Sequence, residues 1–249
     1  MVLIPRVSLW MFGLVVSASA LAATTLAEEK WTGDWLFRAT PEGSAPLRTS
    51  QKAWVDAKRK IVIVDGKVCL REGQLEMFAC PRNTKEYESV VAVDASPGVI
   101  HGGLVRVGAK PGSPVSYDPY KPATGTVIDV IAAWVDKNGR RRAVPAQQWV
   151  MDAKTSKAMS HDWVFAGSRF VRDDEKGRVM YQADEGDFIC VANFSTASLD
   201  IPVKSSKDNS ALNFVAFTAN IPPVDTKVRL ILAPRLDKKK GGESADKAK

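Results

Sequence analysis

The side chains best able to bind a ligand or react are concentrated in one stretch of the chain, from Cys69 to Gly112. This stretch contains two of the three cysteines and one of the two histidines in the 249 residues. Within it, Glu86, Glu88 and His101 offer carboxylate and imidazole groups. Such oxygen and nitrogen ligands bind divalent metals, zinc for example at about 2.0–2.2 Å. These three residues are therefore the candidate ligands of a divalent metal.

The same group also has a purely structural interpretation. Glu86 and Glu88 are two positions apart, so they share a face on a strand but diverge on a helix. The interval from Glu88 to His101 matches no standard metal-binding motif. In the alternative, Lys85 and the glutamates form paired or solvated surface charges, while His101 packs at the start of a helix.

The cysteine positions restrict the redox chemistry open to the chain. Cys69, Cys80 and Cys190 include no C-x₂-C pair, and the common iron–sulfur clusters need four thiolates, so a cluster held by one chain is not expected. The turn residues Glu72-Gly73 predict a hairpin that places Cys69 and Cys80 four positions out of register. At ~3.3 Å per residue this separates them by about 13 Å, beyond the ~7 Å Cα limit for a disulfide. A bridge between these two is therefore not expected.

Catalytic motifs of hydrolases are not recognised in the sequence. It contains no G-x-S-x-G, the motif that forms the nucleophile elbow of α/β-hydrolases. A Ser-His-Asp triad would have to take its base from His101 or His161. His161 precedes Trp163 in a stretch that is typical of the entrance to a strand. The sequence therefore favours a protein that is not an enzyme.

Strands dominate the elements that would position these side chains. Short apolar or alternating runs recur between turns rich in Gly, Asp and Asn, with Asp65-Gly66 among the predicted turns, which is typical of antiparallel β-structure. These runs cover residues 53–55, 61–64, 67–70, 75–79, 126–135, 163–165, 170–172, 179–183, 188–192, 212–217 and 228–232. The Asn138-Gly139 pair tolerates positive φ at both turn positions, and predicts a hairpin that returns through residues 140–144.

Helical periodicity is confined to two short segments, 99–107 and 146–153. The predicted fold class is therefore mainly β (α+β): a single β-rich domain of short antiparallel strands with one or two short helices. The pattern does not decide between one open sheet, a sandwich and a barrel.

The first 27 residues are typical of a secretory signal peptide. Arg6 precedes an apolar run of about 17 residues, 7–23, which ends in small residues of the A-x-A type. That run is short for a membrane span, which takes roughly 20 residues, although an uncleaved anchor is the alternative. We therefore expect export to the periplasm or the extracellular space, with no membrane span after cleavage.

The segments that flank the expected domain differ from it in composition. Residues 28–49 are rich in Pro, Gly and Ser, and predict a linker or a loosely packed arm. Residues 235–249 carry six Lys/Arg against three Asp/Glu, and predict a disordered basic tail that either contacts an anionic surface or is simply solvated. The chain has a net charge of +7 but no basic patch with interleaved aromatics, so nucleic acid is not an expected partner.

Several segments, in order along the chain, carry a family resemblance. They are LEMFACPRNTKEYESV (75–90), VGAKPGSPV (107–115), YKPATGTVIDV (120–130), HDWVFAGS (161–168), GDFICVANFSTASLDIPVKSS (186–206) and FVAFTANIPPVDTKVRLILAP (214–234). Together they resemble the YdjY-like domain of bacterial cell-envelope proteins, particularly the form found in secreted planctomycete proteins. The resemblance covers nearly all of residues 50–234.

The resemblance bears on two of the candidate groups. Relatives commonly read K-E-H-E-S where this chain has Tyr87 between Glu86 and Glu88, so the strongest candidate metal ligand of the family is replaced. Cys80 and Cys190 both lie in family-like segments, which makes them the favoured disulfide pair. Because the run around Cys190 is apolar, a buried, unreactive thiol is the alternative for that residue.

The family has no established activity, so the resemblance implies a location and a fold without naming a reaction. The favoured interpretation is a non-enzymatic envelope protein that binds an unknown envelope partner or a small ligand. The loop at 117–122, rich in Tyr and Pro, is a candidate contact surface. The alternative is a metal-binding or redox protein centred on Cys80, Glu86, Glu88 and His101.

Overall fold

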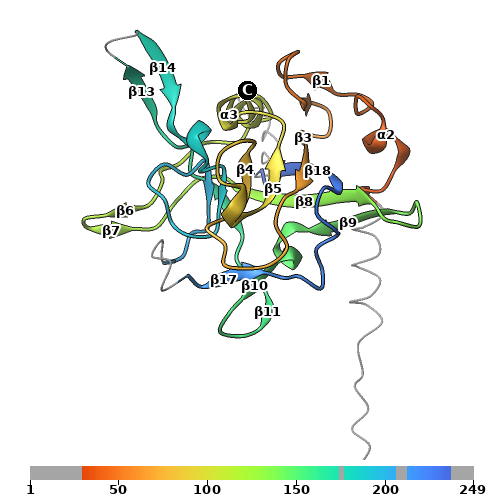
Figure 1. Cartoon of the computed structure of the whole chain (residues 1–249). Helices are drawn as coiled ribbons and strands as arrows, with labels where there is room; N and C mark the ends of the chain where they lie inside the picture. The colour runs from red at the N-terminus through yellow and green to blue at the C-terminus, as the bar shows by residue number, and fades with distance from the viewer. Residues whose placement is uncertain (1–29, 174–176, 206–211, 237–249) are drawn as a thin grey trace, which may run out of the picture.

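The computed structural model describes residues 30–173, 177–205 and 212–236 (Figure 1). The expected signal peptide, and the expected tail beyond residue 236, lie outside these ranges. The main sheet is a ring, because its last strand, β5, pairs again with β3. Around the ring the strands are β3 (Ile61–Val68), β18 (Lys227–Pro234), β8 (Val127–Val135), β12 (Trp163–Phe165), β16 (Leu199–Asp200), β15 (Ile189–Cys190), β4 (Met77–Pro81) and β5 (Ser89–Val93). The predicted β-rich class is confirmed, although β4–β5 and β15–β16 pair in parallel.

The inward face of the ring carries the main hydrophobic core. Alternate residues of β8 and β18 enter it, as the two-residue period of a strand requires. Phe78, Trp149 and Trp163 are fully buried there, and the Phe78 ring lies 5.6 Å from that of Trp163 and 6.3 Å from that of Trp149. The Trp163 indole N–H donates to the carbonyl of Cys190 at 2.8 Å, so this large side chain is buried with its polar atom satisfied.

Residues 30–49, which we call the arm, cover part of the outward face. The arm contains α2 (Asp34–Phe37) and β1 (Ala45–Pro46), and β1 pairs with β2 (Ala53–Asp56) beside β3. Trp31 and Leu36 are buried in a second cluster with apolar residues of β2, β3 and β18. The segment predicted to be a linker or loosely packed arm thus packs on the sheet. β9 (Arg141–Pro145) pairs with β8 through the predicted hairpin.

One of the two predicted helices forms. Residues 99–107 correspond to α3 (Pro97–Arg106), which packs against β2 and β3. The helix predicted at 146–153 is wrong. A single 3-10 turn, η2 (Ala146–Trp149), leads into β10 (Val150–Asp152), because the backbone of β10 pairs on both sides, with β11 (Lys157–Ala158) and β17 (Phe214–Ala216).

Two hairpins project from the body in Figure 1. They are β6 (Ser116–Tyr117) with β7 (Tyr120–Lys121), and β13 (Phe170–Asp173) with β14 (Arg178–Tyr181), which continues into η3 (Gln182–Glu185). None of the helices in the described ranges has the length and apolarity needed to cross a membrane.

The strand pairing between residues 61 and 93 differs from the sequence-based prediction. Asp65-Gly66 is not a turn, since β3 runs through it and Gly66 lets β5 approach closely: a Cβ there would lie 2.5 Å from the carbonyl oxygen of Ala92. The hairpin predicted around Glu72-Gly73 is also wrong. β5 lies between β3 and β4, antiparallel to the first and parallel to the second.

Candidate functional site

Residues 82–88, which we call the crossover loop, join the parallel strands β4 and β5. Parallel neighbours cannot be joined by a tight turn, and here a short loop with one 3-10 turn, η1 (Glu86–Glu88), makes the connection. The Glu86 carboxylate accepts the backbone N–H groups of Asn83 at 2.5 Å and Thr84 at 2.9 Å. The Thr84 hydroxyl donates to the carbonyl of Pro81 at 2.6 Å. Glu86, a predicted metal ligand, therefore shapes the loop.

The crossover loop lies over two cysteine thiols. The Cys69 thiol donates to the carbonyl of Ser89 at 3.0 Å. A hydrogen bond with Cys80, together with burial, raises the pKa of Cys69. The bond from Cys69 lowers the pKa of Cys80 to about 7 against the opposing effect of burial. The Ser89 hydroxyl, the Lys85 backbone N–H and the Thr84 hydroxyl add to this lowering.

Cys190, the predicted disulfide partner of Cys80, lies in a different environment. Cys190 stands opposite Met77 in the β15–β4 register, three residues from Cys80 along β4, and packs with Met77 and Ala197. Its thiol is fully buried, and burial raises its pKa. Cys69, Cys80 and Cys190 are all free thiols. Cys69 and Cys80 lie on opposite sides of β5, because β5 pairs with both β3 and β4, a topology that the assumed hairpin excluded.

The crossover loop also carries a lysine surrounded by carboxylates. Lys85 Nζ lies 3.0 Å from Asp187, 3.6 Å from Glu88 and 3.7 Å from Glu76, all largely buried. The ammonium also lies 4.7 Å from the centre of the Phe194 ring. We call these five residues the Lys85 cluster. It is held together by one cation among three acidic side chains.

The Lys85 cluster perturbs the titration of its own members. Burial lowers the pKa of Lys85, but the carboxylates, Asp187 first, outweigh this effect and raise it overall. Burial and the neighbouring Glu76 carboxylate raise the pKa of Glu88 to about 7, despite the opposing effect of Lys85. A hydrogen bond with Glu76 adds to this rise, so Glu88 retains its proton close to neutral pH.

Glu88→Gln is expected to flatten the dependence of stability on pH. The pKa of Glu88 is about 7 in the folded state against an ordinary 4.5, so its contribution to stability is complete below about pH 4.5 and is lost as the pH rises to about 7. Between pH 5 and pH 8 the free energy of unfolding of the wild type should therefore fall by about 2 kcal/mol more than that of the variant. Urea unfolding of both proteins at the two pH values measures this difference. An equal change in the free energy of unfolding of the two proteins between pH 5 and pH 8 would contradict the raised pKa of Glu88.

His101 lies in a different environment from the two glutamates. Its Nδ1 is 3.1 Å from the hydroxyl of Tyr181, which donates onward to Ser198 at 3.0 Å. The rings of Phe165 and Phe170 lie edge-on to the imidazole, at 4.9 and 5.3 Å. Burial lowers the pKa of His101, so the neutral ring is favoured.

The three predicted metal ligands thus have separate partners: loop amides for Glu86, Lys85 for Glu88, and Tyr181 for His101. Within the described ranges, no group of three or more His, Cys, Asp or Glu side chains is placed to hold a metal. A divalent metal at these residues stays a prediction.

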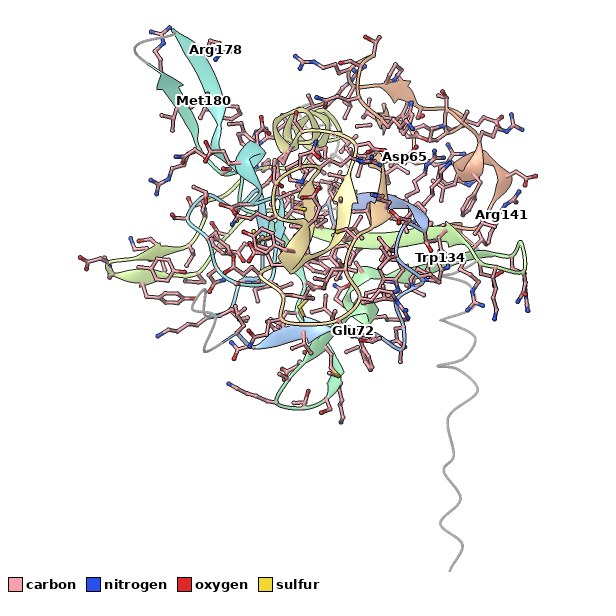
Figure 2. All side chains as sticks on the ribbon, in the orientation of Figure 1. Asp65, Glu72, Trp134, Arg141, Arg178 and Met180 are labelled. Carbon is pink, nitrogen blue, oxygen red and sulfur yellow. The ribbon has the colours of Figure 1, made fainter. Side chains whose placement is uncertain are left out.

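A groove of about 1160 Å³ lies where the middle of the arm, residues 37–39, meets β3, β8 and β18. Its aromatic lining residues are Phe37 of the arm, Trp54 of β2 and Trp134 of β8. Figure 2 shows Asp65 and Trp134 on the same side of the molecule as the arm. We call this feature the arm groove. The sequence did not reveal it, because segments distant in the chain form its walls. The loop at 117–122, predicted as a contact surface, is the separate β6–β7 hairpin.

The arm groove is positively charged. Its described lining includes seven Lys or Arg and four Asp, a net charge of +3. Arg229 binds Asp65 with two nitrogens, at 2.5 and 3.1 Å, donates to the carbonyls of Leu36 and Arg38, and lies over the ring of Trp54. It thereby ties the arm to the sheet and fixes one wall of the groove.

The other acidic residues of the groove are also engaged. Lys67 pairs with Asp225 at 2.6 Å, Arg82 pairs with Asp94, and Asp136 pairs with Arg140 at 4.0 Å. The rest of the basic lining is Arg38, which pairs with Glu42, and three exposed lysines, Lys52, Lys137 and Lys227. The excess positive charge therefore lies on side chains that face solvent.

Comparison with known proteins identifies a family for this domain. Residues 53–233 match the family model described as the YdjY domain. Neither a curated protein nor a solved structure gives a significant match.

Proposed function

The chain belongs to the YdjY domain family, and on this basis we propose that it is an exported, non-enzymatic envelope protein that binds an anionic ligand in the arm groove. Export is proposed from the signal-like composition of residues 1–27. The observation that carries the binding proposal is the net charge of +3 beside three aromatic side chains in a groove of about 1160 Å³. A groove of this size is at the upper end of ordinary ligand sites.

The composition of the arm groove supports binding rather than catalysis. Its described lining contains no histidine, cysteine or serine, the usual bases and nucleophiles of acyl and phosphoryl transfer. Asp65, Asp94 and Asp225 are each held in an ion pair with a lysine or an arginine. The groove therefore offers positive charge and apolar surface without a recognisable reactive group.

The expected ligand follows from that chemistry. Exposed ammonium groups attract phosphate or carboxylate groups, and their attraction weakens with salt. The partly exposed rings of Phe37 and Trp134 offer flat apolar surface to the body of the ligand. An acidic sugar polymer combines anionic groups with ring-shaped units, and is the class of envelope ligand that we propose.

Lys227→Glu is expected to weaken binding of an acidic sugar polymer by about tenfold, or about 1.4 kcal/mol. Lys227 is exposed in the arm groove, so reversing its charge replaces an attraction by a repulsion without disturbing the core. Isothermal titration calorimetry with polygalacturonate, at low and at physiological salt, measures the effect. Neutral dextran serves as the uncharged probe.

Lys157→Glu is the matched control, because Lys157 is exposed on β11, outside the groove lining, and undergoes the same change of charge. It should leave the affinity nearly unchanged. Equal losses in the two variants would show that binding depends on total charge only. Binding of dextran as tight as that of polygalacturonate would also overturn the proposal.

A further inference from the structure

The β13–β14 hairpin presents apolar side chains that the rest of the domain leaves uncovered. Phe170 is 59% exposed and Val179 62%, and Val171 and Met180 are exposed beside them. These are four of the nine large hydrophobic side chains that are exposed in the described ranges. Figure 2 shows Arg178 and Met180 on the hairpin, away from the body of the molecule. Apolar surface gathered on one projecting element is typical of an interaction site.

Packing at its base fixes the direction in which the hairpin projects. Tyr181 is only 4% exposed, and its hydroxyl lies 3.1 Å from Nδ1 of His101 on α3. The Phe170 ring lies 4.8 Å from the Tyr181 ring and 5.3 Å from the imidazole. The strand edges above this base are therefore held in one orientation before any partner binds, which reduces the entropy lost on binding.

β13 has an open edge. Among the described residues it pairs with β14 alone. The Gln182 N–H donates to the carbonyl of Arg169 at 3.0 Å, so residues 169 and 182 are a hydrogen-bonded pair. Such pairs alternate with non-hydrogen-bonded pairs, so the N–H and C=O groups of Phe170 and Arg172 point away from β14 and can pair with a further strand. The outer edge of β14 ends at the buried Tyr181, so β13 is the more open edge.

We propose that β13 pairs antiparallel with β13 of a second copy of this chain, about a two-fold axis at Val171. The sequence Arg169-Phe170-Val171-Arg172-Asp173 is complementary to its own reverse. In this register Val171 lies opposite Val171, Arg169 opposite Asp173, and Phe170 opposite Arg172. Residues opposite one another in an antiparallel ladder share a face, so these become apolar, oppositely charged and cation–aromatic pairs. Such a contact, in which one surface serves both copies, closes a dimer.

The charges of β13 select this register over its two neighbours. An axis at Arg172 would place that residue opposite itself, with like charges in contact. An axis at Phe170 would pair the two rings, but would place Arg169 opposite Val171 and Arg172 opposite Ser168. Of the three registers, the one centred on Val171 gives both arginines a favourable neighbour.

Self-association of the purified protein tests the charge pairs. The contact is smaller than a standard interface of about 1,600 Å², so a dissociation constant on the order of 100 μM is expected in sedimentation equilibrium. Arg169→Glu and Asp173→Arg should each weaken association by about tenfold or more, because each places like charges opposite one another. An equimolar mixture of the two variants should associate as a heterodimer, since opposite charges face each other again. Lys157→Glu, at an exposed position on β11, is the control and should associate like the wild type.

Val171→Cys tests the register. In the proposed ladder, residue 171 forms a non-hydrogen-bonded pair with its own copy, and the Cα atoms of such a pair are about 4.5 Å apart, within the range of disulfides. Val171→Cys should therefore give a disulfide-linked dimer on mild oxidation, detected on a non-reducing gel. Val179→Cys, at an exposed position on β14, is the matched control and should stay largely monomeric.

Three results would overturn the proposal. They are a wild type that stays monomeric up to about 500 μM, five times the expected dissociation constant; an Arg169→Glu variant that associates as tightly as the wild type; and equal cross-linking of Val171→Cys and Val179→Cys. Circular dichroism confirms that each variant is folded. Lys227 lies in the arm groove and not on the hairpin, so Lys227→Glu should associate like the wild type. Failure of this contact and failure of the arm groove therefore remain distinguishable.

Discussion

Replacing Lys85 by methionine is expected to lower the free energy of unfolding by roughly 3 kcal/mol at pH 8, the usual cost of leaving buried charges without their partner. Lys85 is the cation for Asp187, Glu88 and Glu76, which lie within 3.0 to 3.7 Å of its ammonium group. Methionine retains most of the aliphatic stem that packs beside Gly186, where a Cβ would lie 2.7 Å from that stem. The loss of stability therefore measures the effect of removing the positive charge of Lys85 rather than its side-chain volume.

Lys85→Met should lower the free energy of unfolding much less at pH 5 than at pH 8. Without Lys85 the pKa values of the three carboxyls rise, and a raised folded-state pKa gives stability that is present at low pH and lost as the pH rises through it. Urea unfolding at pH 5 and pH 8 measures both values. Lys157→Met, at an exposed position on β11, is the control and should change stability by less than about 0.5 kcal/mol at either pH. A cost for Lys85→Met that does not vary with pH would contradict the role assigned to the lysine.

Gly125→Ala is expected to destabilise the fold by at least about 3 kcal/mol. Gly125 has φ +138°, and a Cβ there would overlap the carbonyl of Phe165, the last residue of β12. That carbonyl accepts the backbone N–H of Gly112 at 2.9 Å, and residue 111 bridges to Gly125. Three segments therefore cross at one point, and a side chain would force them apart.

Gly139→Ala is the control for this prediction. Gly139 has φ +74° in the turn between β8 and β9, but a Cβ there would meet nothing within 4 Å. Its substitution adds only the strain of the left-handed conformation, about 1 kcal/mol. Thermal and urea unfolding of the two variants distinguishes the cost of backbone strain, which both share, from the cost of steric overlap, which only Gly125→Ala adds. Equal losses would show that the crossing at Gly125 tolerates a side chain.

The sequence predicted best what is decided locally. The β8–β9 hairpin was found because Asn138-Gly139 supplies the turn and the alternating run before it supplies the buried face. α3 was found from its own periodicity after Pro97. The wrong predictions concern residues whose conformation depends on a strand distant in the sequence. Gly66 was interpreted as a turn residue, but it accommodates the close approach of β5.

The candidate sites were harder to predict for the same reason. The sequence identified Lys85, Glu88 and Cys80 as side chains of interest and allowed Lys85 to pair with Glu88, but it did not indicate their more distant partners. Asp187 and Cys69 reach them only through the closure of the ring and the crossover loop. The arm groove depends on packing between the arm and β18, more than a hundred residues apart, and no local pattern signals it.

The position of β18 has a consequence for when the molecule can fold. β18 is the last strand among the described residues, yet it lies between β3 and β8 and pairs with both along most of its length. Until residues 227–234 are available, β3 and β8 have no common neighbour and the ring is open between them. Long-range pairing of this kind slows folding, because the entropy of ordering the intervening chain is lost before the contacts form. A chain still emerging from a ribosome or a translocation channel would therefore stay open until its final strand is free.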